Sequence, residues 1–296
     1  MKQVLFFAAL FSIQPATAQS RLVSQEAEDY YAWFQERSQT AGHYVAGTTL
    51  RSFSGAATIH EGPCREAAII GQVGLNKEMV NLGYGDDYYL PEDEINGYGD
   101  FWYHVKAVSS SGKKVSGYVW GGDVAKAWAV GDVDGDGKEE HLLLGLASRP
   151  RASLKKIEAE LKVVGQTGQL VTARILPGLC IFEDCGASVL LRTVHAAAGF
   201  DMIEASTVAL GCWAGIEKAY YSFDGSTLSP AYYAEYTTGT VHYNEPVVVS
   251  GKAGAQVCTF STEDKSYDPI WSCEPLEKGK GQASAAYVEG PALAGN

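Results

Sequence analysis

The chain has 296 residues, a formal net charge of −12 and a pI near 5.0. So acidic a chain, with no basic stripe, would repel a polyanion, which excludes nucleic acid as a partner. Hydrophobic residues make up 46% of the chain, and its 17 tyrosines and many Val and Thr residues favour strands over helices. We therefore expect an all-β globular protein with two domains.

Residues 1–18 have the features of a secretory signal peptide. Lys2 precedes an apolar run, and Ala16-Thr17-Ala18 forms an A-x-A site that predicts cleavage before Gln19. The apolar run is too short to span a bilayer, and no later stretch reaches spanning length. The sequence therefore predicts an exported protein, periplasmic or secreted, with no membrane span.

Residues 19–54 are expected to form an N-terminal helix and a linker. Within 21–37, apolar residues recur at spacings of three and four, which is typical of one face of an amphipathic helix. Packing of this helix against the first domain is the preferred interpretation, and binding of a partner is the alternative. The residues on the apolar face are Val23, Ala27, Tyr30, Tyr31 and Phe34.

Residues 55–127 carry the motifs of a small β barrel. Gly62-Pro63-Cys64 is a turn, Ile69-Ile70-Gly71 begins a strand, and a tryptophan strand at Trp102 precedes a second strand, Gly117-Tyr118-Val119. This segment resembles the bacterial SH3-like domain, although His60 and Cys64 replace the Arg and Ser common in that family. The resemblance implies an SH3-like barrel that binds a peptide, a protein or peptidoglycan.

An insertion from Tyr84 to Gly99 lengthens one loop of this predicted barrel. It contains five acidic residues and four tyrosines. Rigid aromatic side chains with polar tips are common in recognition loops, so the insertion is one candidate ligand contact. The alternative is a solvated loop whose tyrosines pack on the barrel.

A dense run of carboxylates follows at 132–140. Asp132, Asp134 and Asp136 alternate with Val133 and glycine, and short apolar runs on both sides predict strand, loop, strand. Carboxylates this close repel one another unless a cation lies between them. Calcium takes six to eight oxygen ligands at about 2.3–2.6 Å and is the expected occupant. The alternative is an Asp/Gly turn on an acidic surface.

The loop differs from an EF-hand because Leu143 stands at position 12, where an EF-hand has a bidentate Glu. The pattern D-x-D-G-D-G-x-x-E between strands resembles instead the calcium loop of FG-GAP repeats. Only one such loop is present, so a propeller of repeated blades is not expected. The resemblance implies that calcium is held by Asp132, Asp134, Asp136, the backbone oxygen of Lys138, and Glu140.

The rest of the region 128–278 is predicted to be an antiparallel β domain, either a sheet or a sandwich, that includes the calcium-loop hairpin. Short strand-like segments alternate with Gly, Pro or Asp-Gly. Asp224-Gly225 is expected to be a hairpin turn because glycine accepts a positive φ. Two further strands are expected at 241–250 and 256–260, and 279–296 is expected to be a flexible tail.

Six cysteines in an exported chain indicate disulfide bonds, with fifteen pairings open. Short loops favour Cys180 with Cys185 and Cys258 with Cys273. That choice leaves Cys64 to pair with Cys212.

Two functions remain open from the sequence. The first is an exported, non-catalytic binding or scaffold protein in which calcium stabilises the β domain. The second is a cell-wall hydrolase with the SH3-like part as targeting domain. The six histidines show no metal-site spacing and lie in no nucleophile motif, which favours the first. Candidate carboxylates for the second are Glu204, Glu217, Asp224 and Glu235.

Overall fold

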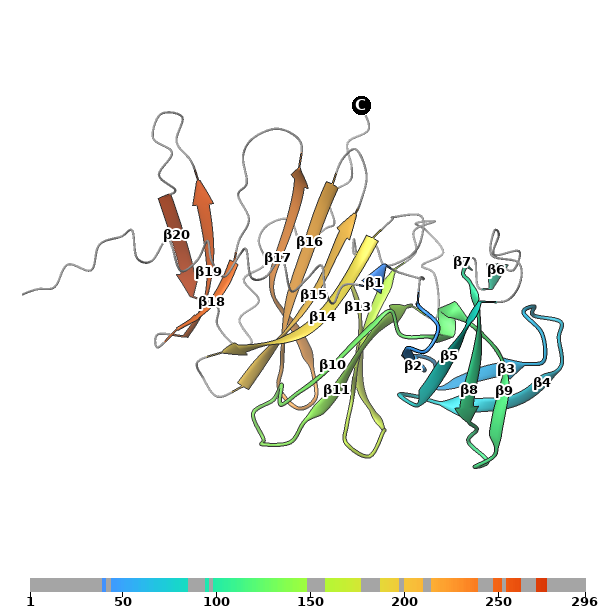
Figure 1. Ribbon diagram of the computed structural model, residues 1–296. Coiled ribbons are helices and arrows are strands. Elements are labelled where there is room, and N and C mark those ends of the chain that lie inside the picture. The colour runs from blue at the N-terminus through green and yellow to red at the C-terminus, as the bar shows by residue number, and fades with distance from the viewer. Residues whose placement is uncertain are drawn as a thin grey trace, which may run out of the picture.

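The computed structural model describes residues 39–40, 44–84, 94–95, 98–147, 158–176, 187–196, 200–209, 214–238, 247–251, 254–261 and 270–275. Their regular elements are antiparallel strands and one 3₁₀ turn, η1 (Gly121–Asp123), which confirms the all-β prediction (Figure 1). The predicted signal peptide 1–18, the helix within 21–37 and the tail 279–296 lie outside the described residues.

A six-stranded sheet forms the N-terminal unit, at the right of Figure 1. Alternate residues of its strands enter one core, which includes Leu50, Ile59, Val73, Tyr103 and Val105. The residues predicted to form an SH3-like barrel, 55–127, supply all strands of this sheet except β2, which pairs with β5. In spatial order the strands are β2 (Thr49–Arg51), β5 (Glu78–Tyr84), β8 (Trp102–Val108), β9 (Lys114–Trp120), β3 (Ala56–His60) and β4 (Ile69–Gly74).

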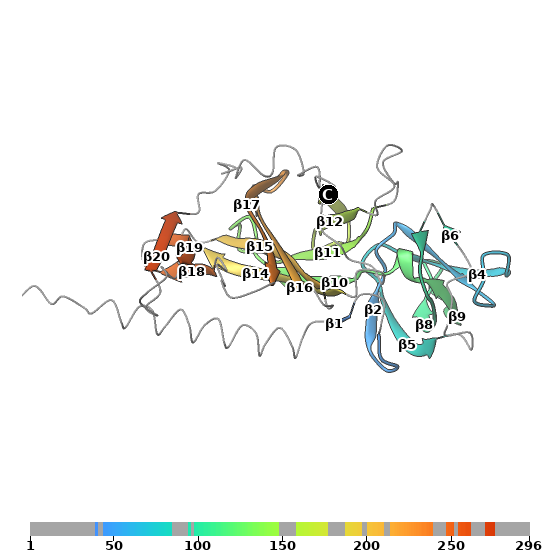
Figure 2. The ribbon, with the colours of Figure 1, turned by 90° about the horizontal axis from the view of Figure 1, so that it is seen from above.

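Three further sheets follow along the chain, as Figure 2 shows from above. The first contains β10 (Ala127–Gly131), β11 (Glu140–Leu146), β12 (Ala159–Val164) and β13 (Leu170–Leu176). The second contains β1 (Gln39–Thr40), β14 (Ala187–Ala196), β15 (Phe200–Ala209), β16 (Ala214–Phe223) and β17 (Leu228–Thr238). The third contains β18 (Val247–Gly251), β19 (Gly254–Ser261) and β20 (Ile270–Pro275).

The sheets β10–β13 and β14–β17 share one apolar core. Leu142, Leu144 and Leu161 from the first sheet join Ile203 and Tyr221 from the second, and all five are fully buried. The outer face of β11 is covered as well, because Leu143 packs in a separate cluster against the N-terminal unit. Because apolar clusters cover both faces of β11, its sequence is a continuous apolar run and does not alternate between apolar and polar residues.

A packed junction joins the N-terminal unit to the sheet β10–β13. Phe53 lies in a buried cluster with Leu143 and Val164. Lys162 donates from Nζ to the Phe53 carbonyl oxygen at 3.0 Å, and the same ammonium lies 3.7 Å from the centre of the Phe53 ring. At this close range a cation over a desolvated ring is attracted to its negative face, so Lys162 holds Phe53 in place.

Gly145 in β11 is expected to tolerate no side chain because Phe53 lies against it. A Cβ atom at residue 145 would stand 2.6 Å from Cγ of Phe53. Gly145→Ala is therefore expected to lower the free energy of unfolding by about 1–3 kcal/mol, the usual effect of overpacking a core. Urea unfolding would measure this loss. Gly55→Ala is the matched control because a Cβ at residue 55 has no neighbour within 4 Å; an equal effect of both substitutions would contradict the expectation.

Asp123 in η1 is expected to make stability depend on pH. Burial raises the pKa of Asp123 above 3.8, and nearby hydroxyl and cationic groups offset this only in part. The folded state then binds a proton more readily than the unfolded state, so the free energy of unfolding falls as pH rises from about 3.8 through the raised pKa. The substitution Asp123→Asn should remove this fall in the free energy of unfolding with rising pH.

Urea titrations at a series of pH values would test the expectation for Asp123. Asp224→Asn is a control with the opposite sign. Hydrogen bonds, first of all from the Thr227 backbone, lower the pKa of Asp224, so this carboxylate stabilises the fold above pH 3.8 and loses that effect on acidification. Identical pH profiles for the native chain and Asp123→Asn would refute the assignment.

Candidate metal centre

The acidic run forms the loop of a β hairpin. β10 pairs with β11 from Ala127 opposite Leu144 to Gly131 opposite Glu140, and residues 132–139 connect them. This arrangement confirms the predicted order of strand, loop and strand. Gly135 and Gly137 have φ values of 80° and 85°, a left-handed conformation that glycine adopts at little steric cost. The two glycines therefore allow the chain to turn tightly between the aspartates.

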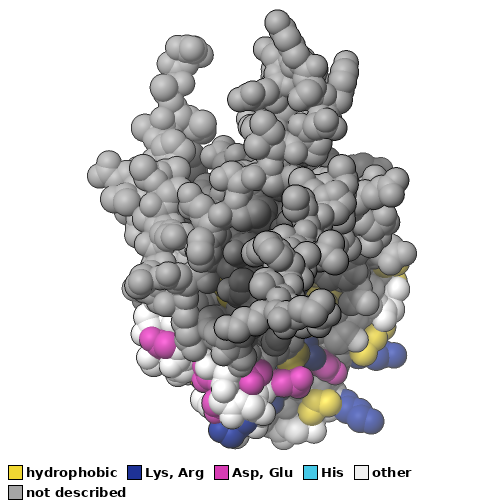
Figure 3. All heavy atoms as spheres, turned by 90° about the vertical axis from the view of Figure 1, so that its left-hand side faces the viewer, with side chains coloured by type: hydrophobic (Ala, Val, Ile, Leu, Met, Phe, Trp, Pro, Cys, Tyr) yellow, Lys and Arg dark blue, Asp and Glu magenta, His cyan; other side chains and the backbone are white. Residues whose placement is uncertain are grey.

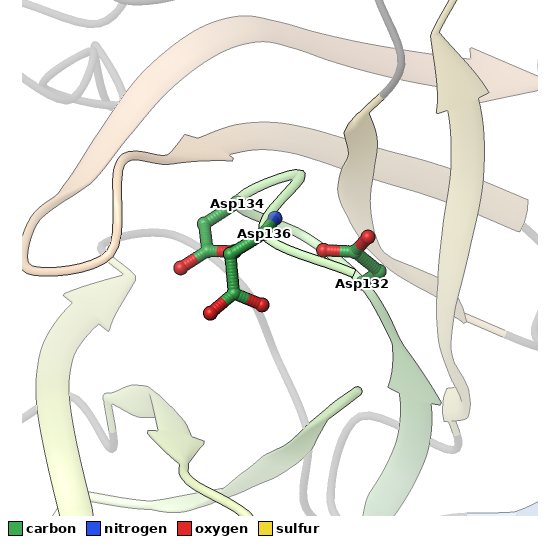
Figure 4. Close-up of side chains that lie close together, drawn as sticks. All are labelled: Asp132, Asp134 and Asp136. Carbon is green, nitrogen blue, oxygen red and sulfur yellow. The ribbon is translucent and has the colours of Figure 1, made fainter. Parts of the chain in front are cut away.

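Three of the predicted ligands come together in this loop. Asp132, Asp134 and Asp136 each offer a carboxylate oxygen, and these oxygens lie within 4.8 Å of one another (Figure 4). Backbone N–H groups orient them: Gly135 and Gly137 donate to the two oxygens of Asp132 at 2.8 and 2.9 Å. The backbone thus fixes the side chains so that their charges converge.

Lys138 contributes a feature that the sequence did not predict. Its ammonium lies 2.7 Å from Oδ2 of Asp136, and both side chains are exposed. This hydrogen bond lowers the pKa of Asp136 and raises the pKa of Lys138. A cation binding at Asp136 would compete with this ammonium, and exposed ion pairs are weak enough to be exchanged.

Glu140 does not join the three aspartates. It is buried at the start of β11, where its Oε2 accepts a hydrogen bond from the Val133 backbone at 3.2 Å. Burial raises the pKa of Glu140, and repulsion from Asp134, Asp136 and Asp132 raises it further. In this structure Glu140, the fifth predicted ligand, therefore stabilises the end of the loop through its hydrogen bond with Val133.

The turn between β16 and β17 lies against the same loop (Figure 4). A Cβ atom at Gly225 would stand 3.2 Å from Oδ2 of Asp134, and Gly225 has φ of 89°, which confirms the predicted Asp224-Gly225 turn. The contact joins segments distant in sequence, so no local pattern could have predicted it. It brings the two sheets together beside the three aspartates.

The donor set fits a hard divalent cation. Carboxylate oxygens are the ligands that calcium prefers, and soft metals prefer thiolates or imidazoles. Within the described part of the chain, this is the one group of three or more potential metal-ligating side chains close enough to share an ion. Figure 3 shows carboxylates among the described side chains at the lower end of the molecule.

The carboxylates considered for hydrolysis lie in different settings. Glu204 is fully buried and receives hydrogen bonds from Arg192 Nε at 2.7 Å and from Ser206. Glu217 of β16 is the direct register partner of Glu235 of β17. The sheet therefore pairs two of the four residues, a relation that their sequence spacing had not revealed.

His60, in the turn that contains Cys64, is held by Thr58 and Ala67. The ring nitrogens of His60 lie 3.0 Å from Oγ1 of Thr58 and from the carbonyl oxygen of Ala67. Cys64 is an exposed free thiol, which contradicts its predicted pairing with Cys212. Cys212 itself, like Cys180 and Cys185, lies outside the described residues.

No family model, curated protein or solved structure matches this chain. Among the residues described, no helix has the length and apolar character needed to cross a bilayer.

Proposed function

We propose that this chain is an exported, non-catalytic binding or scaffold protein whose acidic loop holds one calcium ion. The observation that carries the proposal is the convergence of Asp132, Asp134 and Asp136 at a hairpin end, with the neighbouring β16–β17 turn against them. An ion there would offset their mutual repulsion and stabilise the contact between two sheets. Lys138, through its backbone oxygen, completes the proposed ligand set, and Glu140 joins it only by exchanging its hydrogen bond with the Val133 backbone for the ion.

The proposed ligand of the N-terminal unit is peptidoglycan, or else a peptide or protein. The sequence resemblance to bacterial SH3-like domains over residues 55–127 supports this ligand class. The junction at Phe53 and Lys162 supports a scaffold role, because it holds the N-terminal unit against the sheet that carries the loop.

Co-sedimentation with purified peptidoglycan would test the binding function. The mature chain should sediment with the polymer in calcium, and chelation should weaken binding if the loop stabilises the binding surface. A protein that stays in the supernatant in both buffers would refute wall binding.

A second candidate function is hydrolysis of wall polymer, which the register of Glu217 opposite Glu235 favours. Direct partners in an antiparallel pair project from the same face of the sheet, and most glycosidases use a pair of carboxyl groups. Release of soluble fragments, abolished in Glu217→Gln, would establish this activity and replace the non-catalytic proposal.

We further propose that Cys258 and Cys273 form a disulfide bond in the exported protein. The two residues are direct register partners in β19 and β20, and Cα separations of about 4.5–5.5 Å in such pairs suit a disulfide. Mass spectrometry of a non-reduced digest should find the two peptides linked. Recovery of both cysteines as alkylated thiols without reduction would contradict the proposal.

A further inference from the structure

The β8–β9 hairpin differs in charge from the rest of this acidic chain. Residues 102–120 contain three lysines and no aspartate or glutamate, although the chain as a whole has a net charge of −12. Lys106, Lys113 and Lys114 are all exposed. None of the ion pairs among the described residues includes one of these three lysines. The hairpin is therefore a local region of positive potential at the lower end of the N-terminal unit (Figure 1).

Two of these lysines share the outer side of the six-stranded sheet with apolar side chains. Lys106 is the register partner of Val80 on β5 and of Ser116 on β9. Lys114 is the register partner of Val108 on β8. Direct partners lie on the same side of a sheet, and so do residues two apart in one strand. We call the surface formed by these five side chains the lysine face.

The lysine face is open to solvent. Val105 and Ala107, which alternate with its β8 residues, enter the core of the N-terminal unit, so the lysine face lies on the opposite side of the sheet. Val80 and Val108 are 47% and 54% exposed, and the other three side chains are exposed as well. A ligand that covered the two valines would remove apolar surface from water, which favours binding.

The spacing of the two lysines fits an extended peptide. Lys106 and Lys114 are diagonal neighbours on β8 and β9, a relation that places such residues about 7–8 Å apart. Alternate side chains of an extended chain lie on one side, about 6.5 Å apart. Two alternate carboxylates of one peptide can therefore each reach an ammonium. Glu78 of β5 is held by Arg51 at 2.7 Å, so it leaves both lysines available.

We infer that the lysine face binds an extended acidic segment of a partner protein, with Lys106 and Lys114 pairing with alternate carboxylates beside Val80 and Val108. The inference rests on the binding function proposed above and names the partner. Charges more than about 8 Å away are largely screened at physiological ionic strength, so the local lysines outweigh the net charge for a short segment. A long polyanion would extend over the acidic remainder of the chain and is disfavoured.

Fluorescence anisotropy with a labelled octapeptide of alternating glutamate and serine tests the inference. The protein should bind this peptide, and it should not bind the same peptide with glutamine in place of glutamate. Lys106→Glu should weaken binding about tenfold, because it removes one ion pair and adds a repulsion of similar size. Lys77→Glu is the matched control: it makes the same change of charge at an exposed lysine between β4 and β5, outside the lysine face. A melting curve of each variant would show that it folds.

Salt dependence and chemical shifts give two further readouts. Binding should weaken steeply as salt is raised, because the ion pairs are exposed. The amide resonances of Lys106 and Val108 and of Lys114 and Ser116 should shift on titration with the glutamate peptide. Unchanged affinity in Lys106→Glu, or an equal loss in Lys77→Glu, would overturn the inference.

Co-sedimentation with peptidoglycan separates this inference from the function proposed above. A protein that sediments with the polymer and does not bind the glutamate peptide would overturn the inference and leave wall binding in place. A protein that binds the peptide alone would support the inference and exclude the wall polymer as ligand. Binding to neither would refute both. A dimer in sedimentation velocity that Lys106→Glu dissociates would identify a second copy as the occupant and overturn the assignment to a partner protein.

Discussion

Millimolar calcium is expected to raise the unfolding temperature of the protein. A ligand that binds only the folded state stabilises it by about 2.7 kcal/mol at one hundred times its dissociation constant. The three aspartate oxygens within 4.8 Å of one another exist only in the folded hairpin, so the unfolded chain offers no comparable site. Scanning calorimetry in calcium and in chelator would measure the shift.

Substitutions in the loop locate the calcium effect. Asp134→Asn should abolish most of the shift and also raise the stability of the chelated protein slightly, because it removes one of three repelling charges. Asp224→Asn is the matched control: Asp224 is an exposed aspartate of the adjacent turn, and its Oδ1 already accepts hydrogen bonds from Ser226 and Thr227. Superimposable melting curves in calcium and in chelator would refute the metal site.

Lys126→Met is expected to be the most destabilising substitution at the junction. Lys126 is 1% exposed, and its Nζ lies 2.6 Å from Oδ2 of Asp100, whose side chain is 7% exposed. Removing one partner of a buried ion pair leaves the other charge unpaired, at a cost of about 3–5 kcal/mol. Urea unfolding of the variant should show this loss.

Two companion variants identify the cause. Asp100→Asn in the Lys126→Met background should recover much of the lost stability, because it removes the buried carboxylate charge that Lys126→Met leaves unpaired. Glu78→Gln should change stability by less than about 1 kcal/mol, because Glu78 pairs with Arg51 at the surface with its side chain 64% exposed. Equal losses of stability from Lys126→Met and Glu78→Gln would show that burial does not determine how much an ion pair contributes to stability.

Local patterns predicted those parts of the fold that depend on neighbouring residues. The acidic run between two apolar segments predicted a hairpin at 132–140, and Asp224-Gly225 predicted a turn, because a positive φ is a local requirement. The same logic predicted three converging aspartates. It could not predict that Glu140 is buried with the Val133 backbone, since that depends on packing around β11.

Features that join distant segments escaped prediction. Lys126 and Lys162 look like surface residues in sequence, yet both are buried at the junction because Asp100 and Phe53 offer them partners. The contact between Gly225 and Asp134 arises from the packing of two sheets, and the pairing of Glu217 with Glu235 arises from strand register. Spacing along the chain encodes neither.

The three leucines of β11 separate two apolar clusters. Leu142 and Leu144 face the core shared with β14–β17, and Leu143 between them faces the Phe53 cluster. A local opening that exposed this strand to solvent would have to disrupt both clusters at once, so its free energy approaches that of global unfolding. The amide protons of Leu142 to Leu144 therefore belong among the slowest to exchange with solvent. The acidic loop and the junction are therefore connected through a strand that two apolar clusters hold in place.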